Sequence, residues 1–248
     1  MHYYCLHTNL AISPGKLEDL RRKIAPIEGK KEDLWHNHQL EGGKTIHRYP
    51  SVQYKIWKHR FAIIALPYAM DTLFELMKKM PLTIRGYASI DLLKLEKFPL
   101  VIEPTTRMVT YRCNNWLPMD SDYYRLYQGI CTELGISPSE PSINHPTVLT
   151  FFAGLLKEQI LKNAYSLGVL IDPDLLVIRL PEKPLKHSLV KINNQLWSKI
   201  SGLQFEMNLR WPIHLGVGKR TAIGFGMLKP IKNLNHGKQT HFSAVSRL

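Results

Sequence analysis

Three histidines and one lysine near the start of the chain are of the types that move protons and stabilise charge. His36 and His38 lie two residues apart, and His47 and Lys55 follow them. Histidine exchanges a proton near neutral pH, so it can serve as a general base or acid. Lysine can stabilise the negative charge of a crowded phosphate. RNA carries its own nucleophile, the 2′-hydroxyl, so these residue types suit cleavage of RNA without a metal.

Two other interpretations stay open on spacing alone. The histidines can be loop residues without a chemical role, or can bind RNA without cutting it, and spacing by itself favours this simpler interpretation. A zinc site needs further ligands, and none stands at a recognisable spacing from His36 and His38. The cysteines, Cys5, Cys113 and Cys131, have the spacing of neither zinc ligands nor a disulfide framework. We therefore expect no metal and no cofactor.

A second cluster combines four glycines and two cations within eleven residues. Its members are Gly216, Gly218, Lys219, Arg220, Gly224 and Gly226. Glycine allows positive φ and close approach to a ligand, and exposed backbone N–H groups beside cations bind phosphate. Nucleotide motifs do not fit, because a P-loop needs glycine at Ile213 and a dinucleotide fingerprint needs glycine at Thr221. We predict a phosphate-binding loop; the alternative is a tight turn before the last strand.

The composition favours a polyanionic partner. Lys and Arg number 33 against 20 Asp and Glu, which gives a net charge of +13. Such an excess points to nucleic acid or a membrane surface. Hydrophobic residues make up 44% of the chain, enough for a substantial core. No apolar run reaches the length of a membrane span, and the N-terminus lacks signal-peptide features, so we expect a cytoplasmic protein.

The first half has the element order of a ferredoxin-like unit, β-α-β-β-α-β. A helix begins at Ser13-Pro14 and carries Arg21 and Arg22, and a second helix has Thr72 as its expected N-cap. The expected strands and helices are strand 2–11, the first helix, strands 48–57 and 61–66, helix 71–79 and an extended segment at 84–104. Strand alternation places His47, Gln53 and Lys55 on one face. We therefore expect Lys55 on an open sheet surface beside the histidines.

The second half repeats this order more loosely. The expected elements are strand 107–116, helices 120–134 and 147–167, and strands near 174–180, 187–193, 202–211 and 223–229. This predicts an α+β fold with two tandem ferredoxin-like (RRM-like) domains packed side by side. We expect a first domain at 1–104, a second at 105–230 that contains the glycine loop, and a basic tail at 231–248.

Several segments together resemble the RAMP-type CRISPR repeat-processing endoribonucleases, which cut a precursor transcript into guide RNAs. The glycine loop at 216–226 is similar to that family's signature, and the segment at 202–212 to the strand before it. The matching segments of one branch of the family are His36–His38, Tyr49–Lys55, Trp116–Asp120 and Ile160–Ser166. The resemblance covers nearly the whole chain except the tail.

The resemblance implies RNA bound across a cleft between the two domains. It implies metal-independent cleavage that leaves a 5′-hydroxyl and a 2′,3′-cyclic phosphate. His38 is the first candidate for the general base, with His36 and His47 as alternatives, and Lys55 is a candidate phosphorane stabiliser. The expected RNA-binding residues are Gly216, Gly218, Lys219, Arg220, Gly224, Gly226, Arg21, Arg22 and Gln53.

The expected partner is CRISPR repeat RNA, as precursor and as mature guide. Subunits of a CRISPR effector complex and a second copy of the chain in a homodimer are further candidates, and no membrane partner is expected. Two other functions stay open. One is a non-catalytic RAMP subunit that binds the guide RNA in an effector complex, and the other is a ligand-binding or scaffolding α+β protein without an RNA role.

Overall fold

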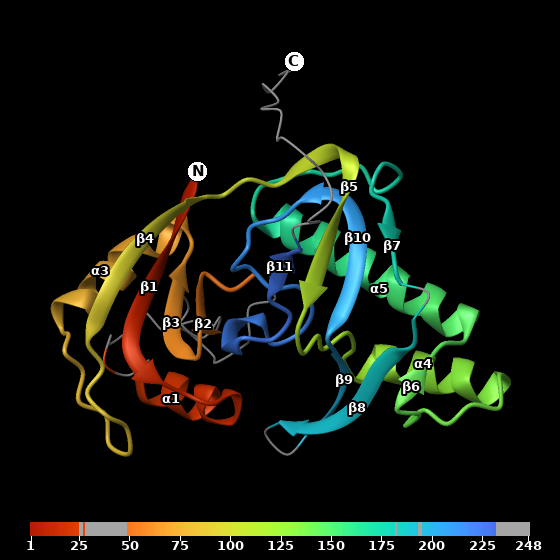
Figure 1. Cartoon of the computed structure of the whole chain (residues 1–248), viewed down its shortest axis with the longest axis horizontal. Helices are drawn as coiled ribbons and strands as arrows, with labels where there is room; N and C mark the ends of the chain where they lie inside the picture. Colours follow the sequence, from red (N-terminus) through yellow and green to blue (C-terminus); the bar gives the residue numbers. More distant parts are fainter. Residues whose placement is uncertain (25–26, 28–48, 182, 193–194, 232–248) are drawn as a thin grey trace, which may run out of the picture.

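The computed structural model describes residues 1–24, 27, 49–181, 183–192 and 195–231. Two halves, each built on an antiparallel sheet, lie side by side, and the glycine loop and the last strand lie between them (Figure 1). None of the helices in these ranges is both long enough and apolar enough to cross a lipid bilayer.

The N-terminal half is a ferredoxin-like unit, as the sequence predicts. Its elements are β1 (His2–Ala11), α1 (Leu17–Ile24), β2 (Val52–Trp57), β3 (Arg60–Ala65), α3 (Met70–Lys78) and β4 (Leu92–Pro99). The sheet order is β2-β3-β1-β4, and each neighbouring pair is antiparallel. The apolar stripe Leu17, Leu20 and Ile24 of α1 is buried against this sheet. Helical periodicity and strand alternation therefore identify each element, but not all of its bounds. α1 begins at Leu17 after the 3-10 turn Pro14–Lys16, β2 begins at Val52, and β4 covers only part of the expected extended segment.

The expected N-cap of the second helix is wrong. Pro67 starts a 3-10 turn, Pro67–Ala69, that leads directly into α3, so the helix begins at Met70. Thr72 lies inside the helix and is buried. The 3-10 turn that Pro67 begins therefore sets the start of this helix, and the threonine packs in the core.

The C-terminal half repeats the sheet order with insertions. Its elements are β5 (Glu103–Cys113), α4 (Ser121–Glu133), β6 (Ser142–Ile143), α5 (Pro146–Ser166), β7 (Ile178–Arg179), β8 (Leu185–Ile192), β9 (Gln195–Ser201), β10 (Leu203–Arg210) and β11 (Leu228–Pro230). The main sheet has the order β11-β5-β10-β7. This is the ferredoxin-like order with β5, β7, β10 and β11 as its four strands. The glycine loop, which holds only the 3-10 turn Thr221–Ile223, stands where the second helix would be.

Three expectations for this half need correction. β9 is an additional strand that pairs with β8, and both form a separate sheet with β6. The last strand is shorter than expected, since Gly224 and Gly226 have φ of 89° and 70° and cannot continue a strand. β7 is limited to two residues because it pairs with β10 only at Ile178 and Arg179. The expected helix 120–134 is confirmed as α4, and the Asp120 side chain accepts a hydrogen bond from the Tyr123 N–H at its N-terminus.

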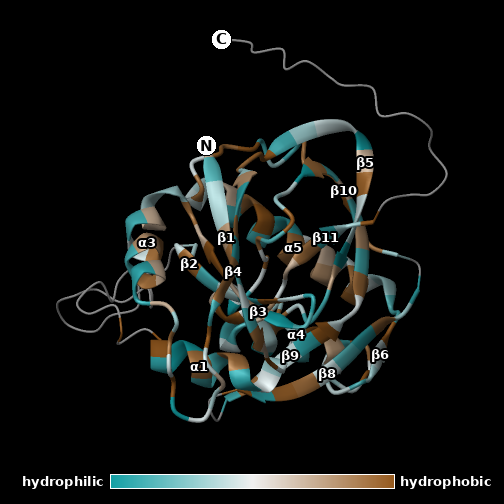
Figure 2. Cartoon of the chain, turned by 60° about the vertical axis from the view of Figure 1, so that its left-hand side comes forward, coloured by the Kyte–Doolittle hydropathy of each residue, from teal (hydrophilic) through white to brown (hydrophobic). Residues whose placement is uncertain are grey.

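The two halves share one of the two buried hydrophobic clusters. Tyr3, Cys5 and Ile64 of the first sheet belong to the same buried cluster as Tyr111 and Leu215 of the second half. Figure 2 shows hydrophobic residues of both halves gathered in the interior, around β3 and α5. The first sheet therefore packs α1 and α3 on one face and the second domain on the other.

Candidate functional site

The glycine loop is joined to the first domain by two hydrogen bonds from the β2 region. The Tyr49 hydroxyl donates to the Gly216 carbonyl at 2.9 Å, and Lys55 Nζ donates to the Thr221 carbonyl at 2.8 Å. Both side chains are buried, with 3% and 1% of their surface exposed. We call this contact between β2 and the glycine loop the seam.

Lys55 lies inside the seam, so the expectation of an open sheet surface is wrong. Alternation correctly places Lys55 on the face opposite Tyr54, but the second domain covers that face. Burial lowers the pKa of Lys55 to about 7, because the interior disfavours the charged ammonium. The amine therefore changes its protonation near neutral pH while it holds the loop.

Gln53 is also covered. Its side chain is fully buried, and its Nε2 donates to the Pro50 carbonyl at 3.3 Å. The expected position of Gln53 at an RNA-binding surface is therefore wrong, for the same reason as for Lys55: the second domain packs on this face of the sheet.

The glycines of the loop are required by packing. A Cβ at Gly226, where φ is 70°, would stand 1.8 Å from the Val217 carbonyl oxygen. A Cβ at Gly218 would stand 2.7 Å from the Trp116 indole, and one at Gly216 would stand 2.6 Å from the Phe225 carbonyl oxygen. The loop thus folds closely on itself and on Trp116, in agreement with the tight-turn interpretation. Its shape is set before any ligand binds.

The two cations of the loop pair with acidic residues of different domains. Lys219 Nζ lies 2.8 Å from an Asp120 carboxylate oxygen. Arg220, in the left-handed region with φ of 55°, reaches Glu18 of α1 at 3.3 Å and lies 4.9 Å from the centre of the Trp197 ring. Each cation is partly exposed. Ion pairs of this kind are weak enough to be exchanged for phosphate.

The structure brings most of the predicted binding residues to the seam. Arg21 lies close to Arg220 and Glu18, and burial lowers the pKa of its guanidinium. Arg22 is exposed on α1, apart from this cluster. His36, His38 and His47 lie outside the described residues. Tyr49, two residues after His47 in the sequence, contacts the glycine loop.

A histidine that the sequence pattern did not indicate, His214, lies just before the glycine loop in the chain. His214 is buried, its Nδ1 lies 3.0 Å from the Tyr3 hydroxyl, and its ring lies 4.7 Å from the Trp57 ring and 4.6 Å from the Phe98 ring. Burial lowers the pKa of His214 to about 4. A neutral imidazole enclosed by aromatic rings has a packing role. The tertiary contacts, and not the sequence, distinguish His214 from a catalytic histidine.

His7 belongs to an open groove on the uncovered end of the first sheet. Its Nε2 lies 2.7 Å from a Glu96 carboxylate oxygen, and Arg60, Lys94 and Trp57 line the same groove. The alternation of strand 2–11 places His7 on the same face as Tyr3 and Cys5. The sequence does not show at which residue of this strand the second domain stops covering that face.

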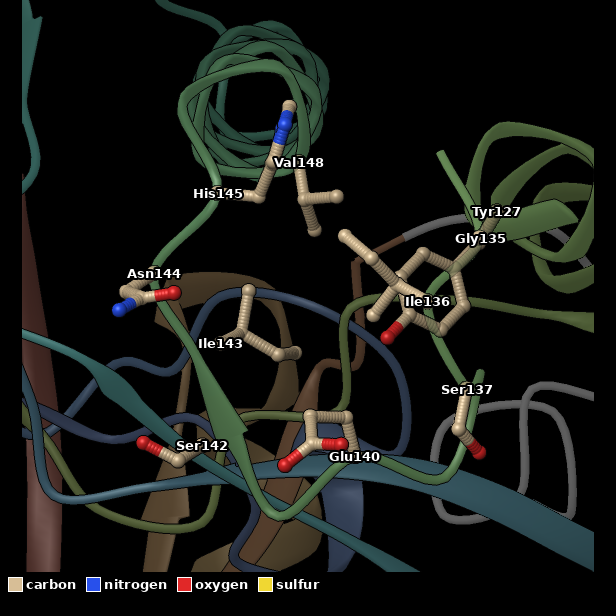
Figure 3. A pocket seen from close by; sticks show the side chains of 10 residues that line it. All are labelled: Tyr127, Gly135, Ile136, Ser137, Glu140, Ser142, Ile143, Asn144, His145 and Val148. Atoms are coloured by element: carbon tan, nitrogen blue, oxygen red, sulfur yellow. The ribbon is translucent and has the colours of Figure 1, made fainter. Parts of the chain in front are cut away.

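A further pocket lies away from the seam, between α4, β6 and the start of α5. Figure 3 shows Tyr127, Ile136 and Ile143 facing its hollow, with Glu140 at its lower side. It contains none of the predicted site residues. Within the described ranges, no three histidine, cysteine or acidic side chains lie together as they would to hold a metal ion.

Comparison with known proteins agrees with this geometry. Residues 1–95 match the family model of the Cas6b N-terminal domain. The N-terminal domain is Cas6b-like. The crystal structure of a Cas6b protein matches with a TM-score of 0.71 and 21% identity, covering 93% of this chain and 100% of that chain. A Cas6b described as a CRISPR RNA processing endoribonuclease matches with a TM-score of 0.65 and 20% identity, over 93% of this chain and 100% of that one.

A RAMP protein described as binding different RNA substrates also matches, with a TM-score of 0.52 and 12% identity, over 94% of this chain and 100% of that one. No curated protein sequence matches the chain significantly. The chain thus has the tandem ferredoxin-like fold of the Cas6 and RAMP proteins, and the resemblance drawn from its motifs is confirmed.

Proposed function

We propose that this chain is an endoribonuclease that cuts CRISPR precursor RNA within its repeats. The observation that carries the proposal is the match of residues 1–95 to the Cas6b N-terminal domain, the part of the chain that contains the candidate histidines. The Cas6b-like fold of both halves, the glycine loop and the net charge of +13 support it.

The reaction needs no metal in this proposal. The 2′-oxygen attacks the adjacent phosphorus while a base takes its proton, and the bond from phosphorus to the 5′-oxygen breaks as an acid protonates that oxygen. The products are a 2′,3′-cyclic phosphate and a 5′-hydroxyl. His38 is the proposed base, with His36 and His47 as the alternatives for this role, because histidine exchanges protons near neutral pH.

Lys55 and the loop cations have supporting roles. Lys55 holds Thr221 and so fixes the loop against β2, while Lys219 and Arg220 bind RNA phosphates by exchanging their partners Asp120 and Glu18. In its protonated form, Lys55 would also favour the negative phosphorane through the field inside the seam.

The test is incubation with repeat RNA in EDTA, followed by end-group analysis of the products. We expect cleavage, with 5′-hydroxyl and cyclic phosphate ends. His38→Ala should slow cleavage by about 10²- to 10⁴-fold, the usual contribution of a general base or acid, and should leave binding nearly unchanged. The matched control is His2→Ala, because His2 is an exposed histidine of the same domain.

Three results would contradict the proposal. These are a strict requirement for Mg²⁺, linear phosphate ends, or full activity in the His36→Ala/His38→Ala double variant. Tight binding of repeat RNA without any cleavage would instead support a non-catalytic RAMP subunit.

A further inference from the structure

A small pocket opens at the seam, beside the glycine loop. Its volume is about 160 Å³, and both domains line it. Leu17 and Ile56 come from the first domain, and Asn114, Asn115, Phe225 and Lys229 come from the second. The pocket thus combines apolar walls with two side-chain amides and one cation.

The two asparagines form a turn that is attached to the glycine loop. Asn115 has φ of 54°, and its carbonyl accepts a hydrogen bond from the Gly226 N–H at 3.2 Å. Neither side-chain amide bonds to another residue of the described ranges. Each amide offers two donors and one acceptor, the pattern that reads the edge of an unpaired base.

The other walls suit the faces of a flat ring. Leu17 and Ile56 form an apolar side, and Phe225 supplies an aromatic ring that is partly exposed. Unpaired RNA bases are commonly recognised in this way, by stacking on an aromatic ring together with hydrogen bonds to the base edge.

Cations lead from this pocket along the open end of the first sheet. Lys229 Nζ lies 4.7 Å from the centre of the Trp57 ring. Trp57 in turn lines the groove that contains His7, Arg60 and Lys94. A strand of RNA whose base enters the pocket can therefore place its next phosphates beside Lys229 and then beside Arg60 and Lys94.

We propose that this pocket binds one unpaired base of the RNA and thereby selects the nucleotide at one position of the substrate. The inference rests on the proposed RNA substrate, and it assigns base selection to Asn114, Asn115 and Phe225. Lys229 binds the next phosphate of the RNA strand.

The test is an abasic scan of the repeat RNA, measured by filter binding. The protein carries His36→Ala and His38→Ala, so that the RNA stays intact. We expect one position at which removal of the base weakens binding by about tenfold, since stacking of one base contributes about 1–3 kcal/mol. Adding Asn114→Asp or Phe225→Leu should reduce the effect at that position to less than about threefold and leave the other positions unchanged.

The controls make the same chemical changes elsewhere. Asn144→Asp and Phe74→Leu alter exposed residues far from the seam and should keep the position effect. Lys229→Ala is a second variant that should lower the slope of log binding constant against log salt by about 0.7, which is one single-strand phosphate contact. Lys97 lies on the face of β4 opposite to Lys94, so Lys97→Ala should leave this slope unchanged.

The outcomes separate this inference from the proposed function. A flat abasic scan, or a position effect that survives both pocket variants, overturns the inference even when the wild-type protein cuts the repeat. Binding with the predicted scan but without cleavage by the wild-type protein overturns only the proposed activity. A protein that binds neither repeat RNA nor oligo(U) overturns both.

Discussion

The burial of Lys55 makes the stability of the protein depend on pH in a way that one substitution should remove. In the unfolded chain the lysine has its ordinary pKa of 10.5, whereas in the folded protein its pKa is about 7. Between these values the unfolded state binds more protons, so stability rises with pH. The stability that this lysine contributes is present above the unfolded pKa and is lost as pH falls through the folded pKa.

The expected size follows from this linkage. Lys55→Met removes the titration, so the difference in unfolding free energy between variant and wild type should change by about 2 kcal/mol between pH 7 and pH 9. The unfolding free energy of the variant relative to that of the wild type should be higher at pH 7 than at pH 9. Loss of the hydrogen bond to Thr221 costs about 1–3 kcal/mol, and this cost shifts the variant's curve without changing its slope.

The assay is urea unfolding of both proteins at pH 7, 8 and 9. The control is Lys97→Met, which makes the same change at an exposed position of the same domain. Parallel stability curves for Lys55→Met and wild type would refute the reasoning, since they would mean that Lys55 keeps an ordinary pKa in the folded protein.

Three further tests address the glycine loop and its contact with the first domain. Replacing Lys219 and Arg220 together with alanine should lower the slope of log binding constant against log salt by about 0.7 per lost contact, and an unchanged slope would contradict phosphate binding by the loop. Gly226→Ala should destabilise the protein, because the added Cβ meets Val217. Gly129→Ala should instead stabilise it by up to about 1 kcal/mol, because its Cβ enters open space on a helix; equal effects of both changes on thermal unfolding would exclude a close-packed loop. Tyr49→Phe should cost about 1 kcal/mol in urea unfolding through its lost bond to Gly216, and an unchanged unfolding free energy would show that this bond does not contribute.

Local patterns were sufficient to predict most of the helices and strands. Alternation identified β2, and helical spacing identified α1. Such signals act between residues a few positions apart, so they are readable without the tertiary structure. The same signals failed at Thr72, where an upstream 3-10 turn set the start of the helix.

The glycine loop was visible in the sequence, but its construction was not. Four glycines near two cations indicate a loop that can approach phosphate. That Gly226 must lack a side chain depends on the position of Val217, and that Gly218 must lack one depends on Trp116. The contact between Gly226 and Val217 depends on how the loop folds back on itself. The contact between Gly218 and Trp116 joins segments that lie about a hundred residues apart in the sequence.

The sequence by itself determined the order of most elements, the two ferredoxin-like units, the basic charge and the residue types available for chemistry, because these depend on composition and local spacing. Only the tertiary structure decided which sheet face is covered. It buried Lys55 and Gln53 beneath the second domain, and it paired Arg220 of the glycine loop with Glu18 of α1. Alternation tells which side chains share a face of a strand, but the environment of that face depends on a domain that comes later in the chain.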